Sequence, residues 1–270
     1  RVGADPAVPG MVLPSGVRER VAAVHRGSAL PERLRLYDGW ATDYDQHVAA
    51  LEYRAPHLAA ASLAFAFPAA PAEARLLDVA CGTGLVAREV RGGTGWDGMG
   101  WDGVGMRDNA RLPPQLHRHG FRCLHGVDGS AGMLERARST GLYQELRQCV
   151  LGREPLPGPA EQYDAVTVVG ALGEGQVPTT VLPELLRVTK PGGFLCLTTR
   201  SNPSNLRYKW ELEVELGKLE CCGAWQKLLA QEVGYWERAT SEEESTQGTG
   251  YISGVVYLYQ KCPVPPLEED

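Results

Sequence analysis

A short apolar strand that runs into a glycine turn is the feature that most constrains the fold of this chain. Residues 76–79 are apolar except for Asp78, and the turn Gly82-Thr83-Gly84 follows Ala80 and Cys81. A turn of this kind brings backbone N–H groups at the start of a helix close to a bound nucleotide-like ligand. The unit therefore predicts a strand, a turn and a helix that together bind such a ligand.

A second predicted strand also ends in a carboxylate. It closes with Val127-Asp128-Gly129-Ser130, where Asp128 is suited to accept hydrogen bonds from ribose hydroxyls. Asp128 has an alternative role as the cap of the next helix, which its position before Gly129 allows. The pairing with the first motif favours ribose binding. The two motifs together outline a cleft for an adenosine.

Strand and helix patterns alternate through the middle of the chain. We predict strands over residues 75–80, 121–127, 144–151, 163–169 and 194–199, and helices over residues 85–91, 131–139 and 181–189. This alternation is typical of an α/β fold with a parallel sheet covered by helices on both faces. A charged amphipathic helix is predicted over residues 206–229. Strands over residues 235–239 and 250–261 are expected to close the sheet edge as an antiparallel pair.

The N-terminal part differs from the alternating region. Helical spacing of apolar residues over 17–26, 31–50 and 56–67 predicts a helical cap over residues 17–70. We expect one domain over residues 17–261, preceded by a disordered or gene-model leader at 1–16 and followed by a tail at 262–270.

Residues 92–119 form a glycine-rich, low-complexity insertion in this domain. One interpretation is a substrate lid with Trp96 and Trp101 as contacts. The other is a disordered loop or translated non-coding sequence, which is favoured because ordering so many glycines costs conformational entropy.

Charge and cysteine content exclude several classes of function. A formal net charge of −6 and dispersed Lys and Arg residues give no basic footprint for nucleic acid. The seven cysteines show no zinc spacing, and neither do His117, His119 and His125, so no metal site is expected. The cysteines are typical of reduced thiols in a cytosolic or nuclear protein. The longest apolar run, residues 58–67, is too short to span a membrane, and we expect a cytoplasmic monomer.

Two cofactors are compatible with the first turn. Residues 82–87 satisfy the GxGxx(G/A) dinucleotide pattern, which alone is a weak signal. Asp78 argues against a dinucleotide, because its carboxylate repels a pyrophosphate and attracts a ligand that carries ammonium and sulfonium groups. S-adenosylmethionine has these charges and an adenosine, so we expect it as the cofactor. An NAD-dependent oxidoreductase is the alternative.

These motifs resemble those of the class I S-adenosylmethionine-dependent methyltransferases. Residues 77–84 and 126–134 are similar to their first and second binding motifs, and residues 37–45, 163–166 and 190–195 to their cap, fourth strand and turn into the fifth. The resemblance covers residues 17–261 apart from the insertion. It implies a Rossmann-like fold with a seven-stranded mixed sheet, helices on both faces and an N-terminal helical cap. Residues 53–56, 170–172 and 250–254 look closest to a methyltransferase-like protein within the class.

The resemblance also implies which residues hold the cofactor. It places Asp78 near the methionine amino group and Asp128 on the ribose hydroxyls. The positions where an acid often contacts the adenine amine are occupied by Leu151 and Gly152. Backbone groups must therefore bind the adenine amine there. The assigned residues are Tyr37, Tyr44, Arg54, Asp78, Ala80, Cys81, Gly82, Thr83, Gly84, Asp128, Gly129, Ser130, Met133, Leu151, Gly152, Val169, Gly170 and Ala171.

Three of these side chains come from the predicted cap. Arg54 is a candidate partner for the methionine carboxylate, because a planar guanidinium suits that group; a surface ion pair is the alternative. Tyr37 and Tyr44 are candidates to face the sulfonium by cation–π attraction or to cover the ribose. Packing of the N-terminal helix is the alternative role for both.

No catalytic base is evident in the sequence. Methyl transfer displaces a group from an already activated sulfonium, so alignment and desolvation supply most of the acceleration. His47, His57, Asp43 and Glu174 are candidates to line an acceptor site, with solvated positions as the alternative. The fourth strand lacks the Asn/Asp-Pro-Pro-aromatic loop of enzymes that methylate nucleic-acid bases or glutamine. We expect a methyltransferase with a small-molecule acceptor; the alternative is a non-catalytic cofactor-binding protein that acts through a partner.

Overall fold

The computed structural model describes residues 13–25, 29–67, 73–91 and 120–263. The insertion at 92–119 and most of the predicted leader and tail lie outside these residues. Seven strands form one sheet in the order β3-β2-β1-β4-β5-β7-β6. Their bounds are β1 Arg75–Val79, β2 Cys123–Asp128, β3 Glu145–Gln148, β4 Tyr163–Leu172, β5 Thr189–Arg200, β6 Trp225–Arg238 and β7 Tyr251–Lys261.

The sheet is mixed, as predicted. Strands β1 to β5 pair in parallel, while β7 pairs antiparallel with both β5 and β6. The order reverses at β1, whose neighbours are β2 and β4. In open α/β sheets such a switch point leaves a crevice at the carboxyl ends of the strands, where ligands bind.

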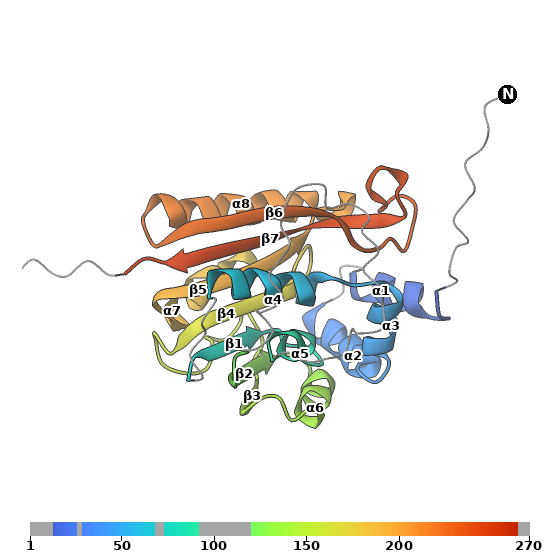
Figure 1. Cartoon of the computed structure of the whole chain (residues 1–270). Helices are drawn as coiled ribbons and strands as arrows, with labels where there is room; N and C mark the ends of the chain where they lie inside the picture. The colour runs from blue at the N-terminus through green and yellow to red at the C-terminus, as the bar shows by residue number, and fades with distance from the viewer. Residues whose placement is uncertain (1–12, 26–28, 68–72, 92–119, 264–270) are drawn as a thin grey trace, which may run out of the picture.

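Helices cover both faces of the sheet (Figure 1). Successive residues of β1 serve opposite faces, because side chains alternate along a strand. Leu76 packs with residues of α4 (Ala55–Ala66) and α5 (Leu85–Val90), whereas Leu77 packs with residues of α7 (Leu182–Val188) and α8 (Leu206–Cys221). Helix α6 (Ala131–Ser139) contacts β2 and β3. The shorter 3-10 helices are η2 Thr179–Val181, η3 Pro203–Asn205 and η4 Thr246–Gly248.

Three helices, α1 (Val17–His25), α2 (Leu30–Trp40) and α3 (Tyr44–Ala50), form the cap at one end of the sheet (Figure 1, right). Residues 31–50 were expected to form one helix, but a turn at residues 41–43 divides it. Trp40 lies at this break, where its ring meets Tyr44 edge-on at 4.9 Å and its indole N–H donates to His47 Nδ1 at 2.8 Å. The break therefore places an aromatic cluster beside the sheet.

The predicted helix over residues 206–229 is wrong in its last third. Helix α8 ends at Cys221, and residues 225–229 belong to the 14-residue strand β6. Trp225 explains the change, because its buried ring packs against Tyr259 of β7 at 4.6 Å and its indole N–H donates to the carbonyl of Leu216. Burial of a large aromatic ring here outweighs the local helical pattern.

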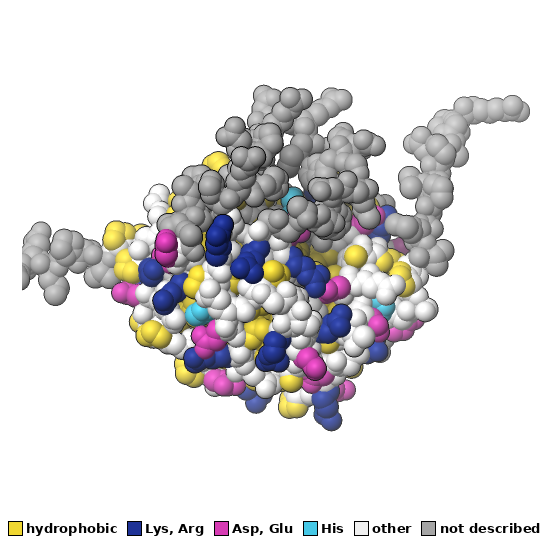
Figure 2. All heavy atoms as spheres, turned by 60° about the horizontal axis from the view of Figure 1, so that its bottom comes forward, with side chains coloured by type: hydrophobic (Ala, Val, Ile, Leu, Met, Phe, Trp, Pro, Cys, Tyr) yellow, Lys and Arg dark blue, Asp and Glu magenta, His cyan; other side chains and the backbone are white. Residues whose placement is uncertain are grey.

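Within the part of the chain that the structure describes, helices are too short or too polar to cross a membrane. Basic and acidic side chains are interspersed on the face that Figure 2 shows.

Candidate active site

A cavity lies at the carboxyl ends of β1, β2 and β4, under the cap. It encloses about 770 Å³ including its open mouth. We call it the glycine-turn cavity. Eleven of the eighteen predicted cofactor residues line it: Tyr37, Tyr44, Ala80, Gly82, Asp128, Gly129, Met133, Leu151, Val169, Gly170 and Ala171.

Seven further lining residues were not predicted: Leu30, Arg33, Leu34, Cys149, Val150, Gln176 and Val177. The first three come from α2 of the cap, and Cys149 and Val150 follow β3. The cap has no binding motif of its own. Its residues line the cavity because the cap packs on the sheet, and the local sequence pattern does not show this tertiary contact.

Asp128 joins the two predicted turns. Its Oδ2 accepts from the backbone N–H of Gly82 at 2.9 Å, and its Oδ1 accepts from Ser130 N–H at 2.8 Å. Burial raises the pKa of this carboxyl, although the two N–H donors act to lower it. Each carboxylate oxygen can accept a further hydrogen bond, and Asp128 lines the cavity, which suits the two hydroxyls of a ribose. The helix cap is a different residue, since Ser130 Oγ accepts from Met133 N–H at the start of α6.

Gly82 borders the cavity with its backbone exposed to it. A Cβ placed on Gly82 would meet no atom within 4 Å, so a side chain there would extend into open space. Ala80, beside it, has a φ of +57°, a conformation that side chains rarely adopt. The chain at this turn is thus shaped for close approach of a ligand to the backbone.

Asp78 does not line the cavity. It is 1% exposed and accepts hydrogen bonds from Tyr143 Oη at 2.7 Å and from Thr167 Oγ1 at 2.9 Å. Burial raises its pKa to about 6, against the lowering effect of the two hydroxyls. Asp78 lies beneath the turn, where it connects β1 to β4 and to the loop before β3. Its contact with the methionine amino group of the cofactor stays a prediction.

Six other predicted residues lie around the cavity without lining it. Cys81 packs toward Leu134 and Ala137 of α6. Thr83 donates to Asp45 of the cap, and Arg54 donates to the carbonyl of Tyr235. The other three are Gly84, Ser130 and Gly152. Gly84 is the N-cap of α5 and Ser130 is the N-cap of α6.

Two carboxylates of the cap hold it onto the two turns. Asp45 accepts from Thr83 Oγ1 at 2.5 Å and pairs with Arg88 of α5 at 2.8 Å. Asp38 accepts from Ser130 Oγ at 2.6 Å and from Gly132 N–H at 2.9 Å, at the start of α6. The cap is therefore anchored beside both strand ends that border the cavity.

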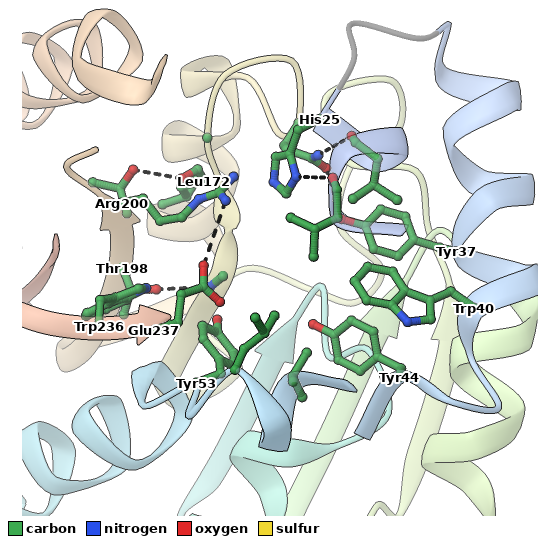
Figure 3. Close-up of a pocket in the computed structure, with 18 residues that line it drawn as sticks. His25, Tyr37, Trp40, Tyr44, Tyr53, Leu172, Thr198, Arg200, Trp236 and Glu237 are labelled. Atoms are coloured by element: carbon green, nitrogen blue, oxygen red, sulfur yellow. Dashed lines mark hydrogen bonds and ion pairs between the residues drawn. The ribbon is translucent and has the colours of Figure 1, made fainter. Parts of the chain in front are cut away.

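A second cavity adjoins the first (Figure 3). It encloses about 630 Å³ including its mouth, and we call it the aromatic cavity. Tyr37, Tyr44, Gly170 and Gln176 line both cavities and form their common wall. Gly170 is required in this wall, because its φ is +75° and a Cβ there would lie 2.1 Å from Tyr53 Oη.

The aromatic cavity contains none of the four predicted acceptor-site candidates. Asp43, His57 and Glu174 are exposed, and His47 is buried against Trp40. The structure instead brings Tyr53, Arg200 and Glu237 into this cavity. Within the described residues, no group of His, Cys, Asp and Glu side chains is arranged to hold a metal ion.

The sequence is similar to known methyltransferases. A family model described as a methyltransferase domain matches residues 51–241. Methyltransferase-like protein 27 of Homo sapiens is 51% identical over 214 residues, which cover 79% of this chain and 76% of that protein. Demethylmenaquinone methyltransferase of Symbiobacterium thermophilum is 34% identical over 128 residues, which cover 45% of this chain and 41% of that enzyme. The predicted resemblance is confirmed.

The fold is similar to solved methyltransferase structures. A chain in the complex between the Haloferax volcanii Trm112 methyltransferase activator and a methyltransferase superposes with a TM-score of 0.52 at 16% identity, covering 84% of this chain and 96% of that one. An S-adenosylmethionine-dependent methyltransferase from Thermotoga maritima superposes with a TM-score of 0.50 at 16% identity, covering 84% and 98%. These likenesses confirm the predicted fold.

Proposed function

Since this chain belongs to the methyltransferase domain family, with S-adenosylmethionine as its cofactor, we propose that it methylates a small molecule bound in the aromatic cavity. The observation that supports this proposal is the common wall of the two cavities. Tyr37, Tyr44, Gly170 and Gln176 line both cavities, so an acceptor in the aromatic cavity would lie next to a cofactor in the glycine-turn cavity. Direct transfer needs the reacting atoms about 3–3.5 Å apart, so the proposal requires the two cavities to open onto one another between these four residues.

The residues of the glycine-turn cavity fit the cofactor. Asp128 has acceptor capacity for the ribose hydroxyls, and Gly82 leaves room at the turn. Met133 and Leu151 supply apolar surface for the adenine. Arg33, which lines the cavity from α2, is a better placed candidate than Arg54 for the methionine carboxylate.

The protein's contribution to the reaction is alignment and exclusion of water. When bound, the cofactor supplies a methyl group on a positively charged sulfur. Burial raises the pKa of Tyr37 to about 12 and raises that of Tyr44 well above its usual value, so both phenols remain neutral at physiological pH and are not bases. Their rings and hydroxyl groups instead orient the two ligands at the common wall.

Cofactor binding tests the site directly. We expect Asp128→Ala to weaken S-adenosylmethionine binding by roughly ten- to a hundred-fold, because two charge-assisted hydrogen bonds are lost. Gly82→Val should weaken it by at least as much, since the new side chain extends toward the ligand. Isothermal titration calorimetry measures both. Glu211→Ala, at a half-exposed position on α8 outside the cavity lining, is the matched control and should bind as the wild type does. Wild-type affinity in both site variants would refute the site.

Incubation of cell extract with the enzyme and radiolabelled cofactor tests the acceptor class. A labelled small-molecule product, together with S-adenosylhomocysteine, supports the proposal; a labelled protein or RNA contradicts the small-molecule acceptor. Cofactor binding without any turnover would favour the non-catalytic alternative. We also propose a cytoplasmic location, since all seven cysteines are free thiols.

A further inference from the structure

The aromatic cavity has a charged side and an aromatic side, which Figure 3 shows facing one another. Arg200, at the end of β5, and Glu237, in β6, form the charged side. Arg200 Nη1 lies 3.8 Å from Glu237 Oε1, and the two side chains are 21% and 15% exposed. A closed, hydrogen-bonded pair would have a separation of about 2.7–2.9 Å. The two side chains are thus largely buried, but they are too far apart to hydrogen-bond to each other.

Both members of this pair retain unused hydrogen-bonding capacity. A guanidinium has five N–H donors and a carboxylate has about four acceptor positions. Among the described residues, the contact with Glu237 is the one ion pair of Arg200, and its side chain makes no hydrogen bond. Two buried charged groups with unsatisfied positions are costly unless a ligand or water completes them.

The aromatic side comes mainly from the cap. Tyr37 and Trp40 stack with ring centroids 6.3 Å apart, and Tyr44 meets Trp40 edge-on. Tyr53, from the segment before α4, also lines the cavity and lies next to Glu237 in Figure 3. Among the described residues, the hydroxyls of Tyr44 and Tyr53 have no hydrogen-bond partner. This side fits a flat or bulky apolar group that has few polar atoms.

The charges of the cavity balance. His25 also lines it, but desolvation and the nearby Arg200 lower its pKa to about 4, so its imidazole is uncharged at neutral pH. Burial raises the pKa of Glu237, against the lowering effect of Arg200. With Glu237 ionised, it and Arg200 are the charged side chains among the described lining residues, one of each sign. A ligand with a single charge would satisfy one of them and be repelled by the other. A ligand with both charges satisfies the two at once.

We propose that the aromatic cavity binds a zwitterionic small molecule of the α-amino-acid type, whose carboxylate pairs with Arg200 and whose ammonium pairs with Glu237. Its aromatic side chain lies against the rings of Tyr37, Trp40 and Tyr44 and carries the hydroxyl or N–H group that gives up its proton and takes the methyl group. This inference rests on the proposed function and names the class of its acceptor. The charged head is held on the β5 and β6 side. The side chain then extends toward the wall shared with the cofactor.

Calorimetry on the full chain loaded with S-adenosylhomocysteine tests the proposal. The probes are L-phenylalanine, L-tyrosine and L-tryptophan, each compared with the amine that lacks its carboxylate and the acid that lacks its ammonium group. We expect at least one amino acid to bind ten-fold or more tightly than its amine and its acid. Arg200→Gln should abolish the preference over the amine, and Glu237→Gln the preference over the acid. Arg200→Lys should restore part of the first preference, because it retains the charge without the planar fork.

Two further measurements separate the ways in which this test can fail. Thermal unfolding and S-adenosylhomocysteine affinity are recorded for every variant, since neither Arg200 nor Glu237 lines the glycine-turn cavity. If the wild-type chain does not bind S-adenosylhomocysteine, the proposed function is refuted. Three results obtained with normal cofactor affinity overturn the inference but leave the proposed function standing. They are equal binding of all probes, tighter binding of an amine or an acid than of its amino acid, and no binding of any probe. Unchanged preferences in folded Arg200→Gln and Glu237→Gln variants overturn it as well.

Discussion

The carboxyl group of Asp78 holds its proton more tightly in the folded chain than in the unfolded one, because burial raises its pKa to about 6. The folded state therefore binds more protons than the unfolded state between about pH 4 and pH 6. The free energy of unfolding should fall as the pH rises through this window, by on the order of 3 kcal/mol from this group. Below about pH 4 the carboxyl group is protonated in both states, so it no longer lowers the free energy of unfolding.

Urea unfolding between about pH 2.8 and pH 8, roughly a unit or more outside the unfolded and folded pKa values, measures this effect in wild type and in Asp78→Asn. We expect the variant to lack the fall between pH 4 and pH 6. Tyr143→Phe is the matched comparison: it removes a donor that lowers the pKa, so the fall should extend to higher pH. Parallel curves for wild type and Asp78→Asn would contradict the assignment of this titration to Asp78.

Individual residues differ in how far the sequence predicts their place. Gly82 and Asp128 follow apolar strands directly, so strand ends and turn chemistry were sufficient to bring them together. Arg200 and Glu237 were missed because β7 lies between their strands in the sheet. Their approach also depends on an irregular register between Val233 and Glu237, and no local pattern in the sequence marks such a shift.

At the level of elements, the cap helix α2 should depend on its contact with the start of α6. We expect Asp38→Ala to lower the free energy of unfolding by about 1–2 kcal/mol, because Ser130 Oγ and Gly132 N–H lose their acceptor. Cofactor affinity should fall several-fold too, since Tyr37 and Leu34 line the cavity from the same helix. Urea unfolding and calorimetry measure the two effects.

The exposed Asp43, at the N-cap of α3, provides the control for this prediction. Its side chain makes no cap hydrogen bond, so Asp43→Ala should change neither quantity by more than about 0.5 kcal/mol. Equal effects of the two substitutions would show that the contact with α6 does not anchor the cap.

Element types were more predictable than element ends. The predicted α6 has the observed bounds, because Ser130 gives a clear start signal. The strands β4 and β5 extend beyond the predicted residues because their neighbours continue the hydrogen-bonded ladder. The α8 prediction continued into β6 because a helical pattern and an exposed edge strand share the same charged composition.

At the level of the whole molecule, cofactor binding should stabilise the fold against heat. The glycine-turn cavity joins the cap to the sheet, so the ligand binds the folded chain and not the unfolded one. At a hundred times the dissociation constant this stabilises the fold by about 2.7 kcal/mol, or on the order of 5–10 °C in Tm for a chain of this size. Differential scanning fluorimetry at rising S-adenosylmethionine concentration measures the shift. NADH should give none, and an equal shift with NADH would support the oxidoreductase alternative.

The two cavities are built from different stretches of the chain. Every residue that lines the glycine-turn cavity lies between Leu30 and Val177, whereas the aromatic cavity also needs residues from Thr198 to Glu237. The segment around residues 51–54 closes onto β6 through two backbone hydrogen bonds, Arg54 N–H to the carbonyl of Trp236 and Arg238 N–H to that of Leu51. On the proposed function, substitutions after residue 177 change which acceptor binds in the aromatic cavity, while the lining of the glycine-turn cavity keeps its composition.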